Sequence, residues 1–345
     1  MRALVVENDG TLAIRELSMP EPNDYQVLVK TVACGICNGT DIKIINKKFK
    51  GFSTYPAILG HEGVGKVVKK GKKVTSFKIG DNILKPSMYK PIDGYYGGYG
   101  GFAEYGLAND YRAIVKDGYK VGEKDFREAD YTRQVLPADF DPVSSVMINT
   151  FGEVLSAFRR FGFDKHQSIV VFGSGAVGQS FTRFAKILGL SSIIVCDIDD
   201  DKLKIAQKMG ADCIINNQGE DVKERVRRIC PDGVDYVVDA VGYTEIINQG
   251  MELIKFNGKI CVYGISEDMD MNLDWSKAPL NWMLQFIQLP TYKEEAAAFT
   301  QIVDWIKSGM LVQEDFISQV VDFDDVIEAF KLVEQGKAGK IVVRY

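Results

Sequence analysis

The stretch IVVFGSGAVGQSF, residues 169–181, constrains the fold of this chain more than any other. Its glycines form a G-x-G-x-x-G pattern between an apolar strand and a helical pattern. In such a turn the first glycine permits a tight bend, the second lets the backbone approach a pyrophosphate, and the third lets helix and strand pack closely. Free N–H groups at the helix start favour an anion there. The pattern predicts a dinucleotide-binding turn formed by Gly173, Ser174, Gly175, Ala176, Val177 and Gly178.

A pattern this short also fits a glycine-rich turn that binds nothing, so the surrounding sequence matters. After residue 150, apolar strand patterns alternate with helical patterns, which is typical of a doubly wound parallel sheet in an α/β fold. We predict strands at 168–173, 192–197, 213–217, 234–242 and 259–265. We predict helices at 179–189, 200–210, 220–230 and 244–258.

The second of these strands ends in Asp197, nineteen residues after Gly178. An acid at this distance accepts hydrogen bonds from the ribose hydroxyls of adenosine and repels a 2′-phosphate. The residues that follow are acidic (DIDDDK) and include no arginine to receive such a phosphate. The sequence therefore favours NAD over NADP, although a solvated loop acid is the alternative interpretation of Asp197.

The first 145 residues have a different pattern, with short β-rich runs broken by glycine and proline, which indicates an irregular antiparallel or barrel-like domain. A chain of 345 residues also exceeds the roughly 250 to 300 at which a single core stops growing. We therefore expect two domains. The β-rich runs lie at 3–7, 25–33, 62–68, 81–84 and 102–108. Helical patterns at 294–309 and 324–336 and a strand at 340–345 close the chain.

Composition narrows the class of partner and the location. A net charge of −5 and a pI near 5.4 argue against the basic surface that nucleic acid or an anionic membrane requires. No run approaches the roughly 18 apolar residues of a membrane span. Six cysteines in so long a chain do not form a disulfide framework, and free thiols predict a reducing, cytoplasmic location.

A candidate metal site begins in ACGICNGTDIKI, residues 33–44, where Cys34 and Cys37 form a Cys-x-x-Cys that is ambiguous by itself. The chain has two histidines. His166 lies in a polar stretch before the nucleotide-binding strand, where a surface turn is expected. His61 is followed by an acid inside a glycine-flanked turn, twenty-four residues after Cys37. His61 is therefore the better candidate for a ligand.

Several segments together resemble a known family. Their order and spacing are similar to those of the zinc-dependent medium-chain alcohol and polyol dehydrogenases. The segments are GIC followed by T-D, then GHEGVGKVV, KIGDNI, GGFAEY, the glycine fingerprint, DAVG and GKAGKIVV. The match extends over nearly the whole chain. The resemblance implies an NAD-binding, doubly wound Rossmann sheet at 149–289. It also implies a β-rich, GroES-like catalytic domain formed by 1–148 and 290–345.

The resemblance implies roles for five residues. Cys37 and His61 correspond to zinc ligands, and thiolate with imidazole suits Zn²⁺ at a site that keeps one position open. Glu62 corresponds to a residue beside the metal that can bind or tune it. Thr40 corresponds to the first acceptor of the proton of the alcohol, and Asp41 to the carboxylate that orients the histidine ligand.

The chain departs from the family pattern at two places. It reads C-N-G-T-D where the family reads C-x-[ST]-D, so either the loop bulges at Gly39 with a positive φ or Thr40 is displaced. The third family ligand is Cys, Asp or Glu, but its place, twenty-four residues before the first fingerprint glycine, holds Asn149. Glu62, or Glu153 one helical turn further on, is then the candidate to complete the metal shell.

The resemblance also implies one catalytic zinc and no structural zinc, because residues 84–106 contain none of the four cysteines of the structural lobe. Cys34, at the end of a strand, is expected to face the core. The other cysteines are expected in the core of the second domain, at 196, 213, 230 and 261.

The nicotinamide position of the family corresponds to Val241, Gly242 and Gly264, at the carboxyl ends of sheet strands. We expect a secondary alcohol of polyol, sugar or cyclitol type as the small-molecule substrate, by analogy with family members that lack the structural lobe. A homodimer through the sheet edge around 259–289, or a homotetramer, is also expected.

The tyrosine-rich loop at 89–105 has two interpretations. Tyr95, Tyr96 or Tyr99 supplies hydroxyls or ring faces to the substrate, or these rings pack at an oligomer contact.

Two other functions stay open. A zinc-free enone or quinone reductase of the same superfamily is favoured by Asn149 and opposed by Cys37 with the GHE motif. A non-catalytic, NAD-binding regulatory protein would have kept the fold after losing the third ligand.

Overall fold

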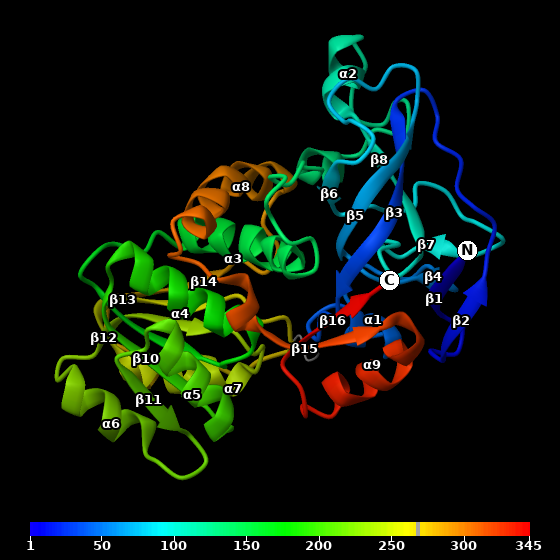
Figure 1. The fold of residues 1–345 in the computed structure, drawn as a ribbon. Helices are drawn as coiled ribbons and strands as arrows, with labels where there is room; N and C mark the ends of the chain where they lie inside the picture. The colour runs from blue at the N-terminus through cyan, green and yellow to red at the C-terminus, as the bar shows by residue number, and fades with distance from the viewer. Residues whose placement is uncertain (267–269) are drawn as a thin grey trace. The chain divides into compact units, whose positions relative to one another are not determined.

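The computed structural model describes residues 1–266 and 270–345, which form two compact units (Figure 1). The domain division expected from the sequence, after residues 148 and 289, stays a prediction. The compact units divide after Gly152 and Pro290, and residues 307–311 belong to the second unit. The first unit comprises Met1–Gly152, Thr291–Ile306 and Val312–Tyr345, and the second comprises Glu153–Pro290 and Lys307–Leu311. No helix in the described ranges is both long and apolar enough to cross a membrane.

The second unit is built on a six-stranded parallel sheet with the order β11-β10-β9-β12-β13-β14. The chain starts in the middle at β9 (Ser168–Phe172), moves outward through two strands, and returns to the other side of β9 at β12 (Val234–Asp239). Such a reversal is where doubly wound sheets bind ligands, beyond the carboxyl ends of the strands. The other strands are β10 (Ser191–Asp197), β11 (Cys213–Asn216), β13 (Ile254–Val262) and β14 (Trp282–Phe286).

Helices connect successive strands of this sheet, and the sequence supplies their ends. The Asp199 side chain accepts two N–H groups at the start of α5, and Gly189 and Gly210 end α4 and α5 with φ of +80° and +112°. Every residue of β9 is buried, as expected for a central parallel strand. The predicted α/β fold is confirmed. The helices are α4 (Ala176–Leu188), α5 (Asp200–Met209), α6 (Val222–Ile229) and α7 (Thr244–Leu253).

The helix predicted at 244–258 is too long. Helix α7 ends at Leu253, and strand β13 begins at Ile254. Asn257 has a φ of +64°, and the pairing of β13 with β12 shifts register in this stretch. A bulge interrupts the two-residue alternation of a strand, so its first residues continued the helical pattern in the sequence.

The first unit contains two sheets. The larger has the order β15-β16-β3-β5-β6, and its long strand β3 also pairs with β8. The smaller has the order β2-β1-β4-β7. The β-rich domain is therefore confirmed. Its strands are β1 (Arg2–Val6), β2 (Leu12–Glu16), β3 (Gln26–Gly35), β4 (Ala57–Ile58), β5 (Glu62–Lys70), β6 (Asn82–Leu84), β7 (Tyr96–Gly97), β8 (Tyr105–Asn109), β15 (Ile317–Asp322) and β16 (Lys340–Arg344).

One end of β3 brings three distant segments together. Gly35 lies opposite Glu62 in the pairing with β5 and opposite Val342 in the pairing with β16. Just beyond β3, the amide of Ile36 donates to the carbonyl of Ile341 at 3.0 Å. The residues after β3, at the start of β5 and at the start of β16 are therefore neighbours.

Helices and a buried cluster support this end of the sheet. Cys34 is fully buried among apolar residues that include Phe102 and Phe330, whose rings meet edge to face at 5.5 Å. Cys34 therefore faces the core, as expected. The remaining helices are α1 (Asp41–Ile45), α2 (Tyr111–Lys116), α3 (Met147–Phe161), α8 (Tyr292–Lys307) and α9 (Val326–Glu334).

Candidate functional site

Cys37, His61 and Glu62 meet in the first unit. One ligand atom from each side chain lies within 4.8 Å of the other two. Cys37 follows β3, and the other two residues stand at the start of β5, so the pairing of these strands creates the cluster. Among the His, Cys, Asp and Glu side chains at 1–266 and 270–345, no other group of three is so arranged. Glu153, the alternative ligand, is not part of it.

Two glycines make room for this cluster. Gly60, before His61, has a φ of +93°, and a Cβ there would lie 2.6 Å from the Phe102 ring. A Cβ at Gly35 would lie 2.3 Å from Glu62 Oε2. Any side chain at Gly35 would therefore displace the Glu62 carboxylate. Sequence reasoning did not single out Gly35, and the only local signal was its place in the CGIC motif.

Asp41 is fully buried and faces two members of the cluster. Its Oδ2 accepts the amide of Cys37 at 2.9 Å, and its Oδ1 lies 3.6 Å from His61 Nδ1. Burial lowers the pKa of His61, but the neighbouring Asp41 carboxylate and Cys37 sulfur outweigh burial and raise the pKa well above its ordinary value. The surroundings therefore favour positive charge at this imidazole. A thiolate, an imidazole and a carboxylate behind the imidazole form a donor set that suits Zn²⁺.

Glu62 is held by a buried lysine. Lys340 Nζ donates to both Glu62 oxygens, at 2.7 and 2.5 Å, and to the carbonyl of Ile36 at 3.2 Å. The Thr150 hydroxyl donates to Glu62 at 3.1 Å. Burial by itself raises the pKa of Glu62, but the charge of Lys340 reverses this and holds that pKa below its usual range. Sequence reasoning missed Lys340, for which the signal was a lysine at the start of an apolar strand.

Asn149 lies in α3 close to this cluster. Its Nδ2 donates to the carbonyls of Val146 at 3.0 Å and Gly63 at 3.4 Å, while its buried Oδ1 has no hydrogen-bond donor. Buried polar atoms are nearly always satisfied by protein, water or an ion. The amide oxygen is therefore a weak candidate ligand, or an acceptor for water in the site.

The CNGTD turn does not bulge in the predicted way. Gly39 is not among the residues with positive φ; instead the Asp41 amide donates to the Cys37 carbonyl at 2.9 Å, as in a helical turn. This turn leads directly into α1, so the additional residue is absorbed without a left-handed position. Thr40 is buried at the start of α1, and its side chain makes no capping bond to that helix.

In the second unit, the glycine fingerprint follows β9 and opens α4. Gly173 has a φ of +94°, and a Cβ there would lie 2.6 Å from Val241 Cγ2. A Cβ at Gly178 would lie 1.7 Å from the Gly173 carbonyl oxygen. A Cβ at Gly175 would meet no atom within 4 Å. The first and third glycines are thus required by the fold, whereas the second leaves open space at the helix start.

This difference predicts two separable effects. Gly175→Ala is expected to leave the thermal midpoint within about 2 °C but to weaken NAD binding about tenfold, because its methyl group enters the space where a pyrophosphate approaches. Gly178→Ala is expected to destabilise the fold itself by more than about 2 kcal/mol through overpacking. Calorimetry and titration with NAD distinguish the two. A Gly175→Ala protein that binds NAD as the wild type does would contradict the assignment.

Asp197 stands at the end of β10, next to this turn. Its Oδ2 accepts the amide of Ser174 at 2.5 Å, and its Oδ1 accepts the amide of Asp199 at 3.0 Å. The carboxylate is therefore fixed beside the fingerprint, and the solvated loop acid is the weaker interpretation.

The three residues expected near a nicotinamide also come together. Asp239 Oδ1 accepts the amides of Val241 and Gly242, each at 2.8 Å. Gly242 has a φ of +98°, and a Cβ at Gly264 would lie 2.2 Å from the Gly242 amide nitrogen. These segments follow β12 and β13 at their carboxyl ends. Asp239, which sequence reasoning left without a role, shapes this turn.

Other predictions have mixed outcomes. His166 lies in an exposed turn with a φ of +65°, as expected. Cys196 and Cys261 are buried, but the expectation that Cys213 and Cys230 belong to the core is wrong, because both are only half-buried against it. Cys213 begins β11, the strand at one edge of the sheet, and Cys230 follows the last residue of α6.

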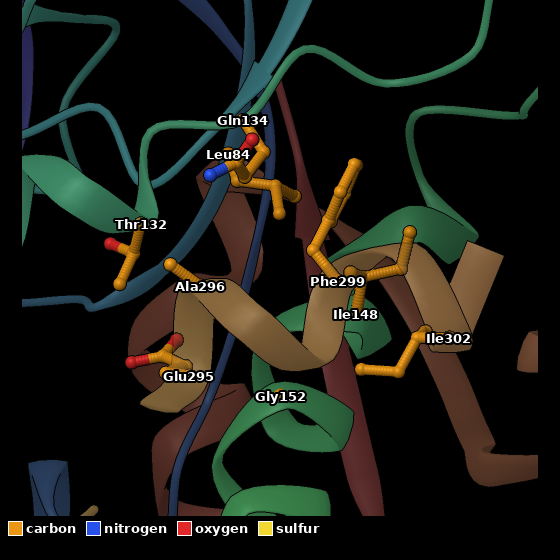
Figure 2. Close-up of a pocket in the computed structure, with 9 residues that line it drawn as sticks. All are labelled: Leu84, Thr132, Gln134, Ile148, Gly152, Glu295, Ala296, Phe299 and Ile302. Carbon is orange, nitrogen blue, oxygen red and sulfur yellow. The ribbon is translucent and has the colours of Figure 1, made fainter. Parts of the chain in front are cut away.

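Two pockets lie in the first unit. Figure 2 shows the smaller, lined by residues of β6, α3 and α8, with a volume of about 10 Å³. Such a volume accommodates about one water molecule. The larger, about 170 Å³, is lined by residues that include Ser76, Asp110 and Arg133. None of the predicted site residues lines either pocket, so neither is the candidate substrate site.

Comparisons with known proteins agree with this geometry. Residues 23–117 match a family described as alcohol dehydrogenase GroES-like domain, and residues 176–307 match one described as zinc-binding dehydrogenase. A sorbitol dehydrogenase of Bombyx mori is 28% identical over 359 residues, covering 99% of this chain and 97% of its own. An alcohol dehydrogenase of Geobacillus stearothermophilus is 28% identical over 355 residues, covering 100% and 99%.

Solved structures share the fold. A benzyl alcohol dehydrogenase of Acinetobacter calcoaceticus has a TM-score of 0.83 at 21% identity, covering 99% of this chain and 98% of its own. A galactitol-1-phosphate dehydrogenase of Escherichia coli has a TM-score of 0.81 at 19% identity, covering 100% of both chains.

Proposed function

The chain belongs to the zinc-dependent medium-chain alcohol and polyol dehydrogenases, and on this premise we propose that it oxidises a secondary alcohol of polyol, sugar or cyclitol type with NAD. The observation that carries the proposal is the meeting of Cys37, His61 and Glu62 within 4.8 Å, backed by Asp41. Relatives named sorbitol and alcohol dehydrogenase support the substrate class.

We propose one catalytic zinc, held by Cys37 and His61 with Glu62 beside them, and no structural zinc. These residues would hold the ion, which would supply a Lewis acid able to lower the pKa of a substrate hydroxyl, as zinc lowers the pKa of bound water to about 7. Asp41 fixes the orientation of the His61 ring. Lys340 neutralises Glu62, so the carboxylate adds little net charge to the cluster.

Other residues of this chain accept the proton and bind the cofactor. Thr40, in the same turn as Cys37, accepts the proton that leaves the substrate hydroxyl. The fingerprint turn binds the diphosphate of NAD, and Asp197 accepts hydrogen bonds from the adenosine ribose. Val241, Gly242 and Gly264 would support the nicotinamide ring, the part of NAD that would accept the hydride.

Metal analysis combined with a turnover assay tests the proposal. The purified protein is expected to hold about one zinc per chain and to form NADH with secondary alcohols, with NAD preferred to NADP. A metal-free protein that reduces enones or quinones would instead indicate the zinc-free reductase. Tight NAD binding without hydride transfer to or from a broad panel of alcohols and ketones would indicate the regulatory protein.

We further propose that the chain forms a homodimer through β14. This strand is the last of its sheet, and unpaired strand edges readily pair with another chain. Large apolar side chains on and around it are exposed, at 96% for Leu280, 52% for Met283 and 47% for Phe286. Met283→Lys is expected to halve the mass measured by sedimentation. A wild-type protein that sediments as a monomer would contradict the proposal.

A further inference from the structure

The loop before β8 is fixed against the segment that leads to His61. The amides of Gly100, Gly101 and Phe102 donate to the carbonyls of Ile58, Gly60 and Leu59, at 3.2, 2.7 and 2.9 Å. The contact is too close for side chains, because a Cβ at Gly101 would lie 2.8 Å from the Gly60 oxygen. The loop is therefore held in place by the same backbone that positions the candidate ligand.

Tyr99 projects from this loop beside the candidate metal site. Its ring centroid lies 5.3 Å from that of His61, with the two planes tilted by 53°. The tyrosine is 36% exposed, so part of its side chain remains accessible while it lies against His61. Tyr99 is thus placed where it can contact a substrate that reaches the cluster.

The backbone at Tyr99 is strained. Its φ of +76° belongs to the left-handed region, which a non-glycine residue keeps only when its surroundings hold it there. Both neighbours of Tyr99 are glycines, yet this strained position holds a tyrosine instead of the glycine that would fit it without strain. Backbone strain of this kind clusters at ligand-binding positions, so the strained backbone indicates a binding role for the Tyr99 side chain.

The other two candidate tyrosines, Tyr95 and Tyr96, have different surroundings. Tyr95 donates its hydroxyl to Glu7 at 3.2 Å. Tyr96 lies in β7, where its backbone pairs with Ala57, and its side chain is 42% exposed. The sequence left all three open as substrate residues; the ring contact with His61 distinguishes Tyr99.

We propose that Tyr99 is a substrate-binding residue that selects alcohols carrying a second hydroxyl next to the reacting one. A tyrosine presents an apolar ring face, which covers C–H groups, and a hydroxyl that bonds to a neighbouring oxygen. A site that hydrogen-bonds a substrate hydroxyl discriminates against the analogue that lacks it. This inference rests on the proposed function and specifies its substrate as a vicinal diol or polyol.

Matched pairs of alcohols test the inference: 2,3-butanediol against 2-butanol, and trans-1,2-cyclohexanediol against cyclohexanol. The quantity of interest is the ratio of kcat/KM for the diol to that for the monoalcohol. Tyr99→Phe is expected to lower this ratio about 3- to 10-fold, through a higher KM for the diol, because one neutral hydrogen bond contributes about 0.5–1.5 kcal/mol. Tyr99→Asn, which tolerates the left-handed backbone, is expected to lower it further.

Tyr96→Phe and Tyr96→Asn are the matched controls and are expected to leave the ratio unchanged. Titration calorimetry of 2,3-butanediol into the zinc-loaded protein without cofactor gives a second readout, in which Tyr99→Phe should weaken binding by the same factor. Unchanged ratios and affinities in both Tyr99 variants would overturn the inference while leaving the proposed function intact. A wild-type, zinc-loaded protein that forms NADH with none of the four alcohols would overturn both.

Discussion

Replacing His61 by asparagine is expected to remove the bound zinc and to lower kcat/KM by at least about a thousandfold. A catalytic metal stabilises the transition state by several kcal/mol, and each 1.4 kcal/mol of that stabilisation changes the rate about tenfold. The imidazole is one of two strong zinc donors in the cluster, and the amide that replaces it is a poor ligand. Zinc content by elemental analysis and NADH formation measure the two effects.

His166→Asn is the matched control, because His166 is the other histidine of the chain and lies in an exposed turn of the second unit. Its φ of +65° suits asparagine. This variant should keep both zinc and turnover. NAD binding should be the same in both variants, since the fingerprint belongs to the second unit and the cluster to the first. Full activity of His61→Asn would contradict the metal site.

Lys340→Met is expected to lower the free energy of unfolding of the zinc-free protein by about 3–5 kcal/mol, because it leaves Glu62 charged, buried and without its cation. Lys340 is 6% exposed and Glu62 is 2% exposed. Of the protein groups that bond to this carboxylate, the Thr150 hydroxyl remains. The charge of the neighbouring His61 also favours the ionised carboxyl group, but it does not replace the ammonium that bonds to both oxygens. Denaturant unfolding after removal of metal by a chelator measures the loss.

The double variant Lys340→Met/Glu62→Gln should recover most of this stability, since replacing both partners of a buried pair is often nearly neutral. Lys66→Met is the control on β5, because Lys66 is exposed and such substitutions usually change stability by less than about 0.5 kcal/mol. If Lys340→Met were as stable as Lys66→Met, the pair would not be a buried ion pair in solution.

The local sequence was sufficient to predict most helices and strands and the functional residues that lie within a single turn. Strand β9, the fingerprint turn and helix α4 are adjacent in the chain. The apolar run before Gly173 and the helical period after it were therefore enough to predict all three. Asp197 follows from a fixed spacing along the same unit. The fold class was predicted for the same reason, since repeated strand–helix units leave few ways to build a sheet.

Prediction was weaker where backbone detail departs from the simple period. The bulge at Asn257 made the start of β13 resemble a helix, and Gly39 takes no left-handed φ although its residue type allows one. Both depend on hydrogen bonds that the residue sequence does not display. In the first case the partner strand sets the register; in the second, the Asp41 amide reaches the Cys37 carbonyl.

The sequence by itself determined the sheet of the second unit, its cofactor turn and the candidate ligands Cys37 and His61. Only the tertiary structure decided that Lys340, 278 residues from Glu62, neutralises that carboxylate, and that Tyr99, among the three candidate tyrosines, lies against His61. The physical reason is the distance along the chain over which each interaction acts. Helices, turns and strand periodicity depend on neighbours in the chain, whereas the register of β3 with β5 and β16 depends on the packing of the whole unit, and that register decides which distant side chains meet.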